Sequence, residues 1–199
     1  MKTIDNKDTF LSEDLVRTLR KGSHVYVMAD CFSLFFFEAL RHQLKHCAAL
    51  DFLFMDKVNI VEEEEAPLGI THPRSLLSRR QLIIRCVRWI QKKARFKVNP
   101  TLKGQEGSIW ILNRQGLVEY TDPAGFTVRT LGWPPTDPAT ARVLQTVLDE
   151  TEGPADTEIL RQKLPGDKQL LRHFHNLWTD TDRTKDVTDE VVDRIMKLW

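Results

Sequence analysis

Cysteine is scarce in this sequence, and long hydrophobic runs are missing. Cys31, Cys47 and Cys86 are its three cysteines, an odd number without C-x-x-C spacing, so neither a disulfide framework nor a zinc site is expected. No apolar stretch approaches the ~18 residues that span a bilayer, and the first residues lack the hydrophobic region of a signal peptide. We therefore expect a cytoplasmic protein without a membrane-spanning segment.

What is present is the composition of an ordinary globular protein. Hydrophobic residues make up 41% of the 199 residues and charged residues 29%, which is enough for one well-buried core. We therefore predict a single domain over residues 1–199. Within it, four consecutive glutamates, Glu62 to Glu65, repel one another and predict an exposed, mobile loop over about residues 57–75.

Helical and strand patterns alternate along the chain. This alternation predicts an α/β protein in which a mixed, largely parallel sheet is flanked by helices. The predicted helices begin near residue 12 and cover 35–47, 79–95 and two stretches within about 167–199; the predicted strands are 24–29, 51–55, 96–98, 108–112, 117–121 and 126–129. Residues 113–116 predict a hairpin turn, whereas residues 139–149 fit either a helix or a strand.

Acidic residues are missing from one interval of the chain. Residues 73–103 carry ten Lys/Arg and no Asp/Glu, whereas residues 1–72 have 8 against 12 and residues 104–199 have 11 against 16. Such an interval is the electrostatic footprint of a surface for phosphate backbones, and we expect Arg85, Arg88, Lys92 and Arg95 along one helix face. The candidate nucleic-acid-binding residues are Arg79, Arg80, Arg85, Arg88, Lys92, Lys93, Arg95, Lys97 and Lys103. The alternative is a solvated face whose cations pair with the acidic flanking segments.

Four stretches of the sequence resemble a known family when they are taken in order. They are CFSLFFFEAL at 31–40, CVRWI at 86–90 with Lys93, GFTVRTLG at 125–132, and LWTD at 177–180 with DVTD at 186–189. Together they resemble the phospholipase D-like domain at the N-terminus of certain prokaryotic superfamily 2 helicases, a group linked to restriction and antiviral defence. The resemblance covers about residues 5–197. It implies half of a two-fold pair, and hence a homodimer or docking on a helicase or another defence subunit.

The catalytic residues of that family are not matched. Active members use a histidine to attack phosphorus, and a lysine two residues later and a later asparagine to stabilise the phosphoryl group. The resemblance places Glu106 at the histidine position, Ser108 at the lysine position and Gly125 at the asparagine position. Because Glu106 would repel the anion that it should attack, we expect no phosphodiesterase activity. A Walker A pattern is also missing, so no means of ATP hydrolysis is expected.

The sequence therefore predicts a non-catalytic module that binds DNA or RNA in a helicase- or defence-associated assembly, without a cofactor. One alternative is a pure assembly subunit without affinity for nucleic acid. A further alternative is a metal-assisted nuclease that uses His72, Glu106 and Asp122. His42 and His46 share a helix face and could bind a metal only with ligands from elsewhere, so no metal site is predicted.

Overall fold

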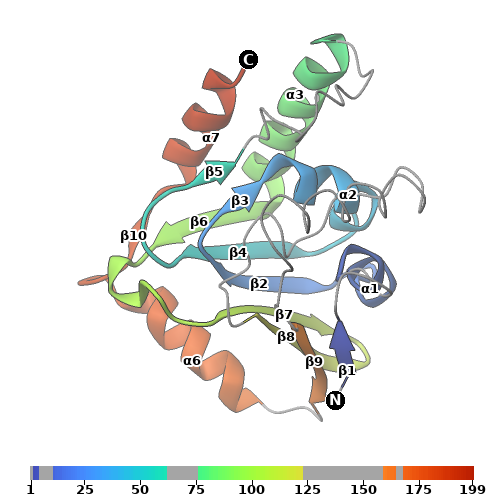
Figure 1. The fold of residues 1–199 in the computed structure, drawn as a ribbon, viewed down its shortest axis with the longest axis vertical. Coiled ribbons are helices and arrows are strands. Elements are labelled where there is room, and N and C mark those ends of the chain that lie inside the picture. Colours follow the sequence, from blue (N-terminus) through green and yellow to red (C-terminus); the bar gives the residue numbers. More distant parts are fainter. Residues whose placement is uncertain (1, 5–10, 62–75, 123–158, 165–167) are drawn as a thin grey trace, which may run out of the picture.

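The computed structural model describes residues 2–4, 11–61, 76–122, 159–164 and 168–199 (Figure 1). The strand predicted at 126–129 and the ambiguous segment at 139–149 lie outside the described residues. So does most of the acidic loop predicted at 57–75.

A β-α-β-α-β unit forms the centre of the fold. Its strands are β2 (His24–Ala29), β4 (Ala49–Phe54) and β6 (Ala94–Val98), and its helices are α2 (Leu34–Leu44) and α3 (Leu76–Lys93). The three strands pair in parallel, with β4 in the middle. Parallel neighbours need a long crossover connection, and the two helices belong to these crossovers.

Antiparallel strands extend the central unit on both sides. β7 (Gly107–Asn113) pairs with β2, and β8 (Gly116–Asp122), β9 (Ile159–Leu164) and β1 (Lys2–Ile4) follow in that order. On the other side of the central unit, β10 (Lys185–Asp186) pairs with β6. The full order is β1-β9-β8-β7-β2-β4-β6-β10.

The hairpin predicted at 113–116 joins β7 to β8. Its Asn113 Oδ1 accepts a hydrogen bond from the Gln115 amide at 2.8 Å, and Gly116 has a φ of +118°, which favours glycine. Three short segments lie outside the main sheet. β3 (Phe32–Ser33) and β5 (Ile60–Val61) pair with each other, and a 3-10 turn covers Pro100–Leu102.

The predicted mixed α/β class is confirmed. Parallel pairing, which the sequence led us to expect across most of the sheet, is confined to β2, β4 and β6. In the main sheet the other described pairings are antiparallel, as the tight hairpin requires for β7 and β8, whereas the separate β3–β5 pair is parallel.

Helices cover the two faces of the sheet unequally (Figure 1). α1 (Leu11–Thr18), α2, α3 and α7 (Thr188–Lys197) contribute buried residues to one core, together with Val27, Phe52 and Phe96 of the central strands. α6 (Lys168–Thr179) packs on the opposite face against Tyr26 and Trp110. None of the described helices is both long and apolar enough to cross a membrane.

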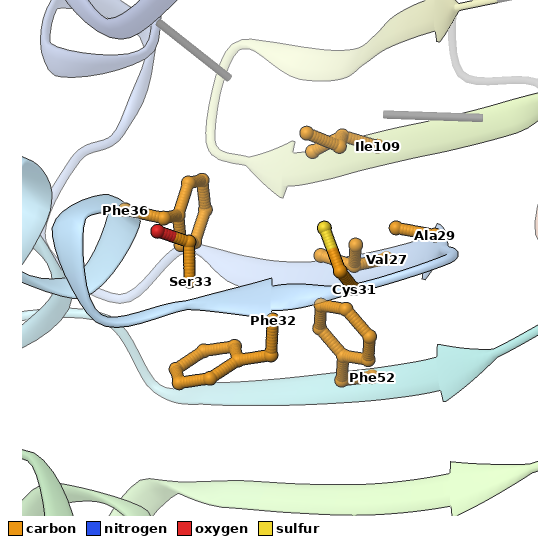
Figure 2. A pocket seen from close by; sticks show the side chains of 8 residues that line it. All are labelled: Val27, Ala29, Cys31, Phe32, Ser33, Phe36, Phe52 and Ile109. Carbon is orange, nitrogen blue, oxygen red and sulfur yellow. The ribbon is translucent and has the colours of Figure 1, made fainter. Parts of the chain in front are cut away.

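Aromatic rings fill the larger core. Phe96 is fully buried, and its ring centroid lies 5.1 Å from that of Phe32 and 5.4 Å from that of Phe52. Figure 2 shows the side chains around a small void beside these rings, where Cys31 and Phe32 face Ile109 and Phe52. Its volume of about 10 Å³ is at or below what one water molecule needs, so it is a packing defect rather than a ligand site.

We expect Phe96→Ala to lower the free energy of unfolding by about 3–5 kcal/mol, because it removes a buried ring and leaves a cavity. Urea denaturation would measure the change. Leu112→Ala on β7 is a suitable control, since Leu112 is 39% exposed and its truncation should cost less than about 1 kcal/mol. Equal losses in the two variants would contradict the assignment of Phe96 to the core.

Candidate nucleic-acid interface

α3 separates its apolar and basic residues onto opposite sides. Ile83, Cys86 and Ile90 are fully buried against the sheet, whereas Arg85 and Lys92 are exposed. Arg88 is also exposed and lies on the same outward stripe, because positions separated by three or four residues share a helix face. The predicted amphipathic helix is therefore confirmed, and its basic side faces solvent.

Two polar contacts hold α3 against the end of α2. Trp89 Nε1 donates a hydrogen bond to the Leu44 carbonyl at 3.2 Å, and Lys93 Nζ donates one to the Cys47 carbonyl at 3.0 Å. Carbonyls at and just beyond the C-terminus of a helix lack partners within the helix, so these donors satisfy groups that would otherwise need water. The outward stripe of α3 is thereby held in a fixed orientation.

Arg85, Arg88 and Lys92, which we call the α3 stripe, make no ion pair or hydrogen bond with the described part of the chain. At a rise of 1.5 Å per residue the stripe spans about 10 Å. Three cations at this spacing, all exposed and all unpaired there, are free to meet phosphate groups of a partner.

The other predicted basic residues have different surroundings. Arg80 lies 4.2 Å from the centre of the Trp199 ring, and Lys103 pairs with Asp56 at 3.6 Å. Lys97 Nζ donates a hydrogen bond to the Trp178 carbonyl at 2.7 Å. The side chain of Arg79 lies outside what the structure describes. These three residues, together with Lys93, whose Nζ binds the Cys47 carbonyl just beyond α2, and Arg95, described next, have a partner in the chain itself.

The predicted position of Arg95 on the basic face of the helix is wrong. This residue was expected to continue the helical stripe, but α3 ends at Lys93 and Arg95 lies in β6. There it points to the α6 face of the sheet, where its Nε lies 3.1 Å from Asp51 Oδ1. The helix ends early because residues 94–98 pair with β4, and alternation along that strand sends Arg95 to the face opposite Phe96.

Asp51 is a buried carboxylate held between two basic side chains. Its Oδ2 lies 2.9 Å from His24 Nε2, and its Oδ1 accepts the bond from Arg95. Burial raises the pKa of the neighbouring Tyr26 hydroxyl, and the charge of Asp51 raises it further. A buried charge is tolerated only when it is paired, so we assign Arg95 and His24 a structural role.

The structure brings together further basic residues that the sequence analysis missed. The connections that precede β2, β4 and β6, and the β7–β8 hairpin, all lie at one edge of the sheet, the right-hand edge in Figure 1. Hydrogen bonds join them, from the Gly22 amide to the His46 carbonyl at 2.8 Å and from Asn113 Nδ2 to the Thr18 carbonyl at 3.1 Å. The exposed basic residues at this edge are Arg20, Lys21, Lys45, His46, Lys92 and Arg114.

No acidic residue occurs in these four connections, 19–23, 44–48, 91–93 and 113–116. We define the amino-edge surface as Arg20, Lys21, Lys45, Arg114 and the α3 stripe. The amino-edge surface could not be recognised in the sequence, because each connection contributes only one or two cations. Only the parallel register of the central strands brings them to one edge.

The opposite edge of the sheet carries acidic residues. Asp30 follows β2 and Asp56 follows β4, and Lys103 pairs with Asp56. Burial raises the pKa of Asp30, and the nearby Asp56 raises it further while Lys103 opposes the shift. The acidic groups of this edge are accompanied by Lys57 and Lys103, whereas the four connections at the amino edge contain no acidic residue.

Among the described residues, those that the resemblance or the nuclease alternative predicts as catalytic do not converge. Glu106 is exposed just before β7, and Ser108 lies on the α6 face of β7 opposite Met28. Asp122 is buried at the end of β8 on the other face, because it is two residues beyond Tyr120 of the larger core. Gly125 and His72 lie outside the described residues.

The described residues contain no group of three or more His, Cys, Asp or Glu side chains that could hold a metal ion. His42 and His46 are both exposed. The three cysteines are buried and form no disulfide with one another, and burial raises the pKa of the Cys47 thiol to about 11. A thiol with a raised pKa is a poor nucleophile, and Cys86 on the inner face of α3 is a core residue as predicted.

Sequence comparison does not assign this chain to a family. Its sequence matches no protein-family model, and no curated protein matches it significantly. The resemblance to phospholipase D-like domains therefore stays a prediction that depends on the four stretches of sequence. The function of the chain must be inferred from the geometry and charge of its surfaces.

Two adjacent lysines should respond differently to substitution. We expect Lys93→Ala to lower the free energy of unfolding by about 1–2 kcal/mol, because it removes a charge-assisted hydrogen bond to the end of α2. Lys92→Ala should change it by less than about 0.5 kcal/mol, because Lys92 is exposed. Thermal or urea unfolding of both variants would measure the difference, and equal effects would contradict the docking of α3 described above.

Proposed function

We propose that this chain is a non-catalytic phospholipase D-like module that binds the phosphate backbone of DNA or RNA through its amino-edge surface. The observation that carries the proposal is the α3 stripe, with three exposed cations that lack partners in the described chain. It is continued by exposed cations from connections that contain no acidic residue. A solvated helix face would be expected to carry charges of both signs.

The dimensions of the surface suit a nucleic-acid backbone. Four neighbouring strands, β7, β2, β4 and β6, set the length of the edge at roughly 14 Å, because strands are spaced about 4.8 Å apart. The α3 stripe adds about 10 Å in another direction. Cations spread over such an area can meet several phosphates at once and release their counterions, which supports binding without sequence readout.

The absence of catalysis is part of the proposal. Covalent phosphodiester cleavage needs a nucleophile and cationic groups directed at the same phosphorus. Glu106 and Ser108 supply neither an imidazole nor an ammonium group, and Asp122 is directed to the other face of the sheet. The proposed module therefore holds nucleic acid for a partner, such as a helicase or another defence subunit, and a homodimer is compatible with the two-fold pairing of related folds.

Protein assembly is the second candidate function. Met196 is 37% exposed and Trp199 is 56% exposed on the outer side of α7, next to Arg80 of α3. Methionine, tryptophan and arginine are enriched at protein interfaces. If assembly were the sole function, the chain would form a stable complex or dimer without measurable affinity for nucleic acid.

The first experiment is a fluorescence-anisotropy titration of labelled duplex and single-stranded DNA and RNA at several salt concentrations. If the surface contacts about five phosphates, affinity for duplex DNA should fall roughly 500-fold between 50 and 200 mM salt. The triple variant Arg85→Ala, Arg88→Ala, Lys92→Ala should bind more weakly. Its log–log salt slope should be smaller by about 2.7, because three phosphate contacts are lost.

A matched control keeps the same change in net charge. Arg172, Arg183 and Lys185 are exposed and lie away from the amino edge, on α6 and near β10. Their triple alanine variant should retain both the affinity and the salt slope of the wild type. No binding by folded wild-type protein, or equal losses in the two triple variants, would remove the proposal in favour of assembly.

A second experiment tests the absence of catalysis. We expect neither the wild type nor Glu106→Ala to cleave labelled DNA or RNA in the presence of Mg²⁺ or Mn²⁺. Both proteins should bind nucleic acid equally, since Glu106 is exposed at the opposite edge of the sheet. Metal-dependent cleavage by the wild type that is lost in Glu106→Ala would instead support the nuclease alternative.

A further inference from the structure

A cavity of about 290 Å³ opens beside α1, where the β7–β8 hairpin meets β9 and β1. Its charged lining is Lys2, Asp14, Arg17, Arg161 and Lys163. Four cations and one carboxylate therefore face the same space. This volume is near the lower limit of about 300 Å³ for pockets that hold small molecules.

Strand register places the central groups of this cavity in one row. Arg161 of β9 lies directly opposite Lys2 of β1 on one side and opposite Tyr120 of β8 on the other. Lys163 follows on the same face, opposite Val118. Directly opposite residues on neighbouring strands lie within about 5.5 Å, so Lys2 and Arg161 repel each other unless an anion lies between them.

Asp14 is the one carboxylate among the described residues that line the cavity. Its Oδ2 lies 2.6 Å from Arg161 Nε and accepts a hydrogen bond from the Tyr120 hydroxyl at 2.8 Å, while Oδ1 lies 3.3 Å from Lys2 Nζ. Burial alone would raise the pKa of Asp14. The bond from Tyr120 and the charges of Arg161 and Lys2 outweigh that effect and lower the pKa, so Asp14 is ionised at neutral pH.

One carboxylate cannot neutralise the four cations of the cavity. Arg161 Nε touches Asp14 but makes no well-directed hydrogen bond, although the atom is buried. Lys163 forms no ion pair with the described residues, and Arg17 has only a loose, exposed pair with Glu13 at 3.8 Å. The described lining residues carry a net charge of about three positive units, or about two when Glu13 beside Arg17 is counted, and this excess in a concave site favours a multiply charged anion.

We propose that this cavity binds a phosphomonoester, with Arg161, Lys2 and Lys163 as the groups that meet the phosphate. Guanidinium and ammonium groups form strong charge-assisted hydrogen bonds to phosphate oxygens. A doubly charged phosphate matches this excess of cations better than a single carboxylate does. The volume leaves room for a sugar attached to the phosphate.

The proposal goes beyond the proposed function, because none of these cations belongs to the amino-edge surface. Two sources could supply the same chemistry: a free sugar phosphate, or the terminal phosphate of a nucleic acid strand. Both present a phosphomonoester, whereas the internal phosphates of a backbone are diesters with a single charge.

Isothermal titration calorimetry at 200 mM salt tests the proposal, with ribose 5-phosphate as the probe, inorganic phosphate as a second anion and ribose as the uncharged control. We expect ribose 5-phosphate and inorganic phosphate to bind and ribose not to bind. Lys163→Ala should weaken the binding of ribose 5-phosphate roughly tenfold. Lys163 is exposed, so this variant should fold, and Lys185→Ala on β10 is a matched control that should bind like the wild type.

Arg161→Gln is a second variant whose effect should be larger, because Arg161 is the central cation of the row; its folding is checked by circular dichroism. Absence of heat with folded wild-type protein, equal affinity for ribose, or undiminished affinity in Lys163→Ala would overturn the proposal. Competition by 5′-phosphorylated but not 5′-hydroxyl oligonucleotides would identify a strand terminus as the source, and no competition would identify a free small molecule. This arm uses the Arg85/Arg88/Lys92 triple alanine variant, in which backbone binding at the amino edge is weakened, and the 5′-hydroxyl oligonucleotide reports the backbone binding that Arg20, Lys21, Lys45 and Arg114 still support. The two proposals therefore fail separately.

Discussion

The parallel register of β2, β4 and β6 is the constraint on which the surfaces of this protein depend. Three parallel strands must all begin at the same edge of the sheet, so the connections that precede them are brought together. These connections carry Lys21, Lys45 and Lys92, which no sequence motif links. The crossovers also hold α3 with its apolar side inward, because Trp89 and Lys93 bind the end of α2. The basic edge and the α3 stripe thus have a common structural cause.

The same register gives the two edges of the sheet different charges. The amino edge is basic, and the carboxyl edge carries Asp30 and Asp56, with Lys103 paired to the second of these. In open α/β sheets ligands commonly bind at the carboxyl ends of the strands. In this chain that edge carries charges of both signs, with Lys57 and Lys103 beside Asp30 and Asp56, and for this reason we propose the amino edge as the surface for a nucleic-acid backbone. Binding there needs no catalytic machinery, which agrees with residues at 106, 108 and 122 that do not converge.

The elements that could be predicted from the sequence are those specified by local patterns. The strand at 24–29 has the bounds expected from its run of β-branched and aromatic residues, and the two helices expected within about 167–199 are α6 and α7. The end of α3 was predicted wrongly, because residues 94–98 satisfy a helical and a strand pattern alike. Pairing with β4 decides between the two and moves Arg95 to the other face. Local pattern therefore identified the basic interval but could not show which of its cations are free.

The cavity beside α1 shows why the remaining features could not be predicted. Arg161 lies in β9, a six-residue strand whose sequence shows no regular alternation of apolar and polar residues by which it could be recognised without its neighbours. Its partners Asp14 and Lys2 come from the other end of the chain, and only the pairing of β9 with β8 and β1 brings them together. Such a buried network is costly unless its charges are compensated. Asp14 compensates only part of the positive charge, so the site stays cationic, which is the condition that a phosphate ligand requires.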